Sequence, residues 1–278
     1  MPYGDLAKQK VQRFATYDDM TKNECTIEER EEYEPHVKNG IVVYAGVDYE
    51  AILREAEKEA DVILWDGGNN DFPFYKSDLE IVVVDPHRAG HELLYYPGET
   101  NFRRADVIIV NKMDTAPKEG IEKVLDNIKK INPAAIVIKA NSPTIVENGE
   151  QIRGKRVLVI EDGPTLTHGG MTYGAGIVAA QKYGAAEIID PRSAAVGSIK
   201  AVFEKYDHLD KVLPAMGYGD SQVRELAETI AKIDCDLIVS ATPIDLNRLF
   251  QTRQPMLPVG YELEEIGSPN LEDVLQKF

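Results

Sequence analysis

Short apolar runs alternate with amphipathic stretches along the whole of this 278-residue chain, and few folds accommodate that pattern. The runs predict strands at residues 40–44, 62–65, 79–84, 107–110, 135–138, 156–160, 187–189, 211–213, 237–240 and 256–261. Helices are predicted between them at residues 49–60, 120–130, 176–183, 197–205, 221–233 and 271–277. Such alternation calls for parallel strands with helices on both faces, so we expect an α/β protein with doubly wound, mostly parallel sheets.

A four-residue motif, Asn111-Lys112-Met113-Asp114, follows the predicted strand at residues 107–110. Guanine-reading loops of P-loop GTPases have this pattern. The Asp114 carboxylate would accept hydrogen bonds from the N1–H and exocyclic amine of guanine, Asn111 would hold the loop, and Lys112 would lie over the base. The alternative is an ordinary strand-to-helix loop in which Asp114 caps the next helix. We expect a nucleotide site here.

The predicted strand at residues 62–65 ends in Asp66-Gly67-Gly68, a pattern that resembles a Walker-B carboxylate. Asp66 is therefore a candidate Mg²⁺ ligand and water-positioning residue, and the alternative is a plain polar turn. Residues 1–65 contain no Gly-x4-Gly-Lys-Ser/Thr phosphate loop. Residues 149–156 match all but its last position, but they precede a strand instead of following one, so we reject them.

The turn-rich stretch at residues 141–154 suggests a boundary between two regions. We expect residues 1–150 to form a P-loop NTPase-like (GTPase-like) region that lacks its first strand and Walker A loop. We expect residues 151–278 to form a second, Rossmann-like α/β region that binds substrate.

A second candidate loop, at residues 85–92, carries His87, Arg88 and His91 after a predicted strand. Ligands of such sheets gather at the carboxyl ends of the strands, so these side chains suit phosphate binding. The alternative is a structural turn. Metal binding by the two histidines is disfavoured because Pro86 and Gly90 argue against a helix that would align them.

A glycine-rich loop at residues 161–176 separates a predicted strand from a predicted helix. It contains Thr165, Thr167, His168, Gly169 and Gly170. This order can present backbone N–H groups and hydroxyls to an anion, which makes these residues candidates for substrate binding. Its spacing matches no known fingerprint, so a tight turn remains the alternative.

Charge and composition limit the partners. The formal net charge of −16 argues against nucleic acid, because affinity for nucleic acid comes from neutralised phosphates. No apolar run approaches the length of a membrane span. Cys25 and Cys235 are far apart without a Cys-x-x-Cys pattern, which is typical of reduced thiols and predicts a cytoplasmic protein.

The motifs quoted above, with Pro2-Tyr3-Gly4-Asp5 and residues 63–75, 84–93 and 213–219, resemble the cyclic 2,3-diphosphoglycerate synthetase family, a P-loop GTPase-like group. Members of this family carry a strand and a phosphate loop directly before the Pro-Tyr-Gly-Asp motif, so the resemblance implies a truncated member. It also implies an enzyme that uses ATP to close 2,3-bisphosphoglycerate into an intramolecular phosphoanhydride.

The resemblance further implies roles for the candidate residues. Asp66 would hold Mg²⁺, and Lys112 would lie near the nucleotide base. Phosphates of the substrate would be bound by the cationic and hydroxyl side chains, namely His87, Arg88, His91, Thr165, Thr167 and His168. The motif at residues 111–114 favours GTP whereas the family reaction uses ATP, so the cofactor is ATP or GTP, with Mg²⁺.

Two other functions remain open at this point. One is a GTPase-type regulator or metallochaperone-like NTPase. The other is a non-catalytic fragment that binds phosphorylated ligands. A homo-oligomer, or pairing with a missing N-terminal segment, is also compatible with the sequence.

Overall fold

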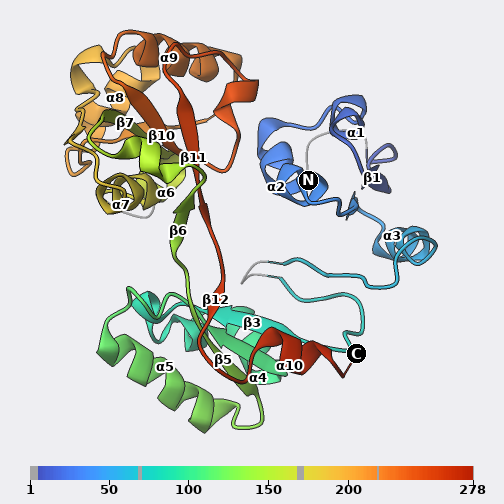
Figure 1. The fold of residues 1–278 in the computed structure, drawn as a ribbon. Helices are drawn as coiled ribbons and strands as arrows, with labels where there is room; N and C mark the ends of the chain where they lie inside the picture. Colours follow the sequence, from blue (N-terminus) through green and yellow to red (C-terminus); the bar gives the residue numbers. More distant parts are fainter. Residues whose placement is uncertain (1–5, 68–70, 168–171, 218, 278) are drawn as a thin grey trace. The chain divides into compact units, whose positions relative to one another are not determined.

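The computed structural model describes residues 6–67, 71–167, 172–217 and 219–277. It divides into two compact units, one formed by Met1–Ile52 with Thr144–Gly260 and the other by Leu53–Pro143 with Tyr261–Phe278 (Figure 1). We call them the six-stranded and four-stranded units after their main sheets. The expected boundary at 150/151 is close to the crossing at 143/144. A single boundary would place residues 1–52 in the first region and residues 261–278 in the second. In the structure, residues 1–52 belong instead to the unit that contains Thr144–Gly260, and residues 261–278 belong to the unit that contains Leu53–Pro143.

The four-stranded unit is built on a sheet with the order β12-β5-β4-β3. Its strands are β3 (Ile81–Val84), β4 (Val107–Val110), β5 (Ile136–Asn141) and β12 (Glu264–Glu265). The first three are parallel, and β12 is antiparallel to β5. All four residues of β4 are buried, as expected of a central strand covered on both faces.

Helices cover both faces of this sheet. Ile108 and Val110 of β4 pack in one core with α4 (Gly98–Arg104) and α5 (Lys118–Ile131). Val107 and Ile109, which point the other way, pack with α10 (Leu271–Leu275). The alternating faces of one strand therefore account for two helical layers, as a doubly wound sheet requires.

The strand expected at residues 62–65 is not formed. This segment follows α3 (Tyr49–Ala56) and has neither helix nor strand in the structure. Val62 is 75% exposed and Leu64 is 80% exposed. A strand needs a hydrogen-bonded neighbour. Among the described residues β3 pairs only with β4 and is the edge of its sheet, so residues 62–65 are not hydrogen-bonded to β3 as a strand.

The six-stranded unit has the sheet order β6-β11-β10-β7-β8, with β9 also paired to β7. The strands are β6 (Thr144–Val146), β7 (Arg156–Asp162), β8 (Glu187–Ile188), β9 (Leu213–Ala215), β10 (Leu237–Ala241) and β11 (Met256–Tyr261). Strand β7 is parallel to β8, β9 and β10, and β10 is parallel to β11. The expected second α/β region is therefore present.

Helices α6 (Gly163–Thr167), α7 (Ala175–Lys182), α8 (Gly197–Lys205) and α9 (Asp220–Ala231) connect these strands. Val157 and Val159 of β7 lie in one core, which includes α7. Leu158 and Ile160 lie in a second core, with α9 on the opposite face. The sheet is thus buried on both faces.

The N-terminal part contains a small antiparallel pair, β1 (Gln12–Phe14) and β2 (Val43–Ala45). Helices α1 (Tyr17–Lys22) and α2 (Ile27–Lys38) each begin with a capping box. The strand expected near residues 40–44 is therefore present, but it pairs antiparallel with β1 instead of joining a parallel sheet. Gly46 permits this close approach, because a Cβ there would lie 2.5 Å from the carbonyl oxygen of Lys10.

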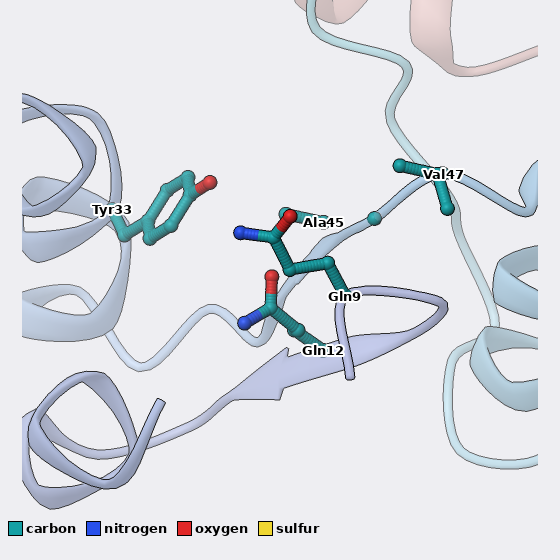
Figure 2. Close-up of a pocket in the computed structure, with 6 residues that line it drawn as sticks. Gln9, Gln12, Tyr33, Ala45 and Val47 are labelled. Carbon is teal, nitrogen blue, oxygen red and sulfur yellow. The ribbon is translucent and has the colours of Figure 1, made fainter. Parts of the chain in front are cut away.

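A small pocket lies beside this pair of strands. Figure 2 shows the amide groups of Gln9 and Gln12 directed toward the ring of Tyr33, with Ala45 and Val47 also on its wall. Its volume of about 30 Å³ suits one or two water molecules. The pocket is therefore too small to be a nucleotide site.

Candidate functional site

The candidate site lies where β3 and β4 end. Val84 and Val110 are partners in the parallel register, so Asp85 and Asn111 follow at the same edge of the sheet. Open α/β sheets bind ligands outside the carboxyl ends of their strands. The loops at residues 85–93 and 111–116 are therefore brought together, as the sequence predicts.

Asp85 connects the two loops. Its Oδ1 accepts a hydrogen bond from the backbone N–H of His87 (3.0 Å), which caps the short helix η1 (Pro86–Arg88). Its Oδ2 accepts from Lys112 Nζ at 3.0 Å and from Arg88 Nη2 at 3.2 Å. Burial raises the pKa of Asp85, but the hydrogen bonds from Lys112 and His87 outweigh it, and the pKa lies below its ordinary value. Asp85 is therefore a carboxylate surrounded by cations.

The loop that carries Lys112 is held at both sides by backbone hydrogen bonds. The N–H of Asn111 donates to Val84 O (3.1 Å), and the N–H of Met113 donates to Ala140 O (3.0 Å) at β5. Lys112 has φ = +55°, a left-handed conformation that is uncommon outside glycine and often marks functional sites. The neighbours of β4 on both sides thus fix this turn.

Asn111 leaves an unsatisfied acceptor in this loop. Its Oδ1 is buried and has no hydrogen-bond partner among the described residues. A buried acceptor without a donor costs about 1–3 kcal/mol, so proteins rarely tolerate one without a reason. The atom can therefore accept a hydrogen bond from a donor that the described residues do not supply.

Asp114 is exposed at the same edge. Its Oδ1 accepts from the backbone N–H of Ser142 at 3.3 Å, which orients the carboxylate next to the end of β5. An exposed carboxylate in a fixed orientation can accept a pair of N–H donors from a ligand. No cap by Asp114 on α5 is formed, since the N-cap of α5 is Pro117.

The two histidines behave differently. The ring Nε2 of His87 lies 2.9 Å from the Thr115 hydroxyl, so His87 joins the two loops. His91 begins the short helix η2 (His91–Leu93), and its ring contacts Tyr95 edge-on with centroids 5.2 Å apart. Arg88 and His87 are exposed beside Asp85, which leaves their charged or polar ends available at the rim.

The loop after β3 is supported from below by α5. Lys123 Nζ donates to Ala89 O at 2.9 Å, and Asn127 donates to the Glu92 carboxylate at 2.6 Å. Gly120 packs against η1 so closely that a Cβ would collide with the carbonyl oxygen of Pro86. The position of Asp85 therefore depends on a glycine in the first part of α5.

We expect Gly120→Ala to destabilise the protein by about 1–3 kcal/mol, because the added Cβ overpacks the contact with Pro86. In an open helix the same change would stabilise by about 1 kcal/mol. Urea unfolding measures the difference. Gly260→Ala on β11 is the control, because its Cβ would meet no atom within 4 Å. A Gly120→Ala variant as stable as the wild type would contradict the packing argument.

Asp66 lies in the irregular segment at residues 61–67 and not at the end of a strand. The described residues contain no group of three or more His, Cys, Asp or Glu side chains that could hold a metal ion. Mg²⁺ in nucleotide sites is commonly bound through one or two carboxylates together with phosphate oxygens. A single carboxylate is thus compatible with Mg²⁺; Asp85 is such a carboxylate at the end of β3, where it is paired with Lys112 and Arg88.

The glycine-rich loop at residues 161–176 begins at the carboxyl end of β7. Thr167 is buried, and its hydroxyl donates to Gly163 O (3.0 Å) within α6. His168, Gly169 and Gly170 lie outside the described residues, as does the side chain of Thr165. The described part of this edge is dominated by Glu161, which is 3% exposed and accepts hydrogen bonds from the N–H groups of Gly174 and Ile177, both at 3.1 Å.

Sequence reasoning noted Asp85 only as an acid at the end of a predicted strand, and it predicted no metal or binding role for Asp85 or Glu161. Each is an acid at the end of an apolar run of Val, Ile and Leu, which is a usable signal. An acid at the carboxyl end of a buried strand is placed either at a ligand edge or against backbone N–H groups. The left-handed turn at Lys112, which directs its ammonium group to Asp85, has no comparable signal in the sequence.

The fold and these loops define an open α/β protein with a candidate ligand edge at the end of β3 and β4. Residues 38–141 match the family described as cyclic 2,3-diphosphoglycerate synthetase, P-loop domain. The chain is therefore similar to this family over that segment. Among the described residues, no helix is both long and apolar enough to cross a membrane.

Curated relatives show which proteins the chain is similar to. Arginine synthetase ArcE of Thermococcus kodakarensis is 66% identical over 278 residues, which is 100% of this chain and 62% of that protein. Cyclic 2,3-diphosphoglycerate synthetase of Thermococcus sibiricus is 32% identical over 114 residues, 40% of this chain and 26% of that protein. The chain thus spans less than two thirds of the length of either relative. LpxK of Aquifex aeolicus in complex with ATP aligns with a TM-score of 0.47 at 13% identity, covering 90% of this chain and 69% of that one, which is too weak to establish a shared fold.

Proposed function

We propose that this chain is the nucleotide-reading and substrate-binding part of a nucleotide-dependent synthetase. The observation that carries the proposal is the loop at residues 111–114, which lies at the carboxyl ends of β4 and β5 with an exposed, oriented Asp114 carboxylate. In this proposal Asn111 holds the loop, Asp114 reads the base, and Lys112 moves from Asp85 to the nucleotide. The match of residues 38–141 to the P-loop domain of that family supports the nucleotide-dependent part of the assignment.

The cationic side chains at the rim fit phosphate groups. His87 and Arg88 are exposed beside Asp85, and His91 follows on the same loop. We assign to them the phosphates of the nucleotide or of a phosphorylated substrate such as 2,3-bisphosphoglycerate. Asp85 is the preferred carboxylate for Mg²⁺, and Asp66 remains a second candidate. The bound ion would offset negative charge as phosphates crowd together.

The product is better inferred from the arginine synthetase than from the cyclic 2,3-diphosphoglycerate synthetases. Identity to the former extends over the whole chain at 66%, whereas the match to the latter covers 40% of it at 32%. We therefore propose a guanidino or ureido amino acid as the substrate class. Closure of 2,3-bisphosphoglycerate is the alternative, and a GTPase-type regulator is a third function that the guanine-type loop would suit.

Titration of the isotope-labelled chain, followed by the amide signals of residues 85–93 and 111–116, tests the proposal. We expect GTP or ATP with Mg²⁺ to shift these signals with a dissociation constant no tighter than roughly millimolar. Backbone phosphate cradles supply much of the affinity in such proteins, and residues 1–65 contain no phosphate loop. Arginine, citrulline and 2,3-bisphosphoglycerate are then added separately. The nucleotide assignment is wrong if neither nucleotide perturbs these amides, and the arginine assignment is wrong if only the bisphosphoglycerate binds.

A further inference from the structure

A buried acid holds the start of α7 to the end of β7. Glu161 is the sixth residue of β7 (Arg156–Asp162), and its Oε1 accepts hydrogen bonds from the backbone N–H groups of Gly174 and Ile177. The same carboxyl group is 3% exposed. We call residues 174–177 the α7 junction. One ionisable side chain therefore hydrogen-bonds this junction to the sheet.

The junction is shaped around this carboxyl group. A Cβ at Gly174 would collide with the Glu161 carboxyl, and a Cβ at Gly176 would lie 3.1 Å from Oε1 and 2.6 Å from Val159 Cγ1. Only glycine allows the backbone to approach so closely at these two positions. The fit is therefore specific to a closed junction with Glu161 beneath it.

The surroundings of Glu161 offer almost no compensating charge. Strands β9 and β10 place Pro214 and Ala241 on either side of it. Helix α7 contributes the backbone of the junction, and Asp162 on β7 itself is a further acid. Among the residues that the structure describes, no cation pairs with Glu161. A buried carboxylate next to another acid is costly, because the charged form loses its hydration.

We propose that Glu161 is a proton-controlled latch, in which the α7 junction stays closed over the protonated carboxyl and is released when that carboxyl ionises. The direction follows from solvation: an ionised Glu161 gains water when the junction lifts, whereas a neutral one gains little. The junction lies at the carboxyl end of the sheet, the edge at which such sheets take up ligands. The latch therefore sets how readily that edge opens, whichever ligand the protein takes.

The pKa of Glu161 is displaced in the direction that this latch requires. Burial raises the pKa of Glu161 from 4.5 to about 7, against the hydrogen bonds from Ile177, Gly174 and Gly176, and the charge of Asp162 raises it further. If the pKa in the open state is close to the ordinary value, protonation favours the closed state. Stability of the closed junction is then complete at low pH and is lost as pH rises through about 7.

Amide hydrogen exchange of the wild type and Glu161→Gln tests the latch. Protection factors, which are corrected for intrinsic exchange, are measured for Gly174 and Ile177 at about pH 6 and about pH 8, and we expect the wild type to lose about tenfold. Glutamine does not ionise, so its protection should not change. Amides of Val159 and Val239 in the sheet core report global unfolding and should lose less than the junction does.

Two histidines carry ionisable rings, and a control variant removes both. His208 Nε2 lies 3.4 Å from Leu166 O of α6, and His168 belongs to the same loop by sequence but lies outside the described residues. A His168→Asn, His208→Asn variant should keep the wild-type pH response. If it loses the response, or if Glu161→Gln keeps it, the proposal is overturned.

A second variant keeps the proposal testable if Glu161→Gln does not fold. Asp162→Asn removes the neighbouring charge that raises the pKa of Glu161. The pH midpoint at which the protection of the α7 junction falls should therefore move to lower pH than in the wild type. A midpoint that moves to higher pH would contradict the role of Glu161.

Discussion

The wild-type protein is expected to lose about 2–3 kcal/mol of unfolding free energy between about pH 5 and about pH 8 through Glu161 alone. The pKa of this group is about 7 in the folded state and 4.5 in its ordinary state. A raised pKa means that the folded protein binds the proton more tightly than the unfolded chain does. The stabilisation is therefore complete below pH 4.5 and is lost as pH rises through about 7.

Urea unfolding of the wild type and of Glu161→Gln over this pH range measures the effect. Other titrating groups are shared by both proteins and cancel in the difference between their curves. As the pH rises, we expect the wild type to lose more unfolding free energy than Glu161→Gln loses, because the wild type must bury a charge above neutral pH. Parallel curves would contradict this prediction, because they would show that ionisation of Glu161 does not change the unfolding free energy. This measurement concerns global unfolding and does not depend on local opening of the α7 junction.

Local pattern predicted most elements because their partners also lie in regular order. Strands β3, β4 and β5 and helix α5 form where apolar spacing places them, and the loop at residues 111–114 lies at the expected edge. The parallel register follows from helices that connect each strand to the next. Where each strand pairs with the next strand along the chain, sequence periodicity is sufficient to predict the element.

The failures concern contacts between distant residues. The run at residues 62–65 has the composition of a strand, but whether it forms one depends on a neighbouring strand, which composition does not reveal. Residues 261–278 return to the four-stranded unit as β12 and α10, after the chain has completed the other sheet. A local pattern cannot predict this return, because either unit could accept an amphipathic helix.

The candidate site was predicted in position but only partly in its contacts. Asn111, Lys112 and Asp114 lie at one edge with His87 and Arg88, as their places after β3 and β4 imply. The ion pair between Lys112 and Asp85 depends on a left-handed backbone at a lysine. Sequence favours glycine or asparagine for such a conformation, so the pairing could not be foreseen.

Asp114→Asn is expected to lower affinity for GTP by about 10- to 100-fold, since a bidentate pair to a base discriminates by about 1–3 kcal/mol. A carboxylate accepts from both the N1–H and the exocyclic amine of guanine, whereas the amide of asparagine replaces one acceptor with a donor. The same amide suits xanthine, which has an oxygen in place of that amine. Affinity for xanthosine triphosphate should therefore rise while affinity for GTP falls.

The two dissociation constants are measured by amide titration, and their ratio is compared with that of the wild type. Asn can still accept the Ser142 N–H through its Oδ1, so the loop should keep its conformation. Asp106→Asn is the matched control, because Asp106 precedes β4 and accepts from the Glu80 N–H at the opposite end of the strand. Its ratio should equal that of the wild type. If Asp114→Asn leaves the ratio unchanged, Asp114 does not read the base. The loop at residues 111–114 would then be a structural turn that joins β4 to α5.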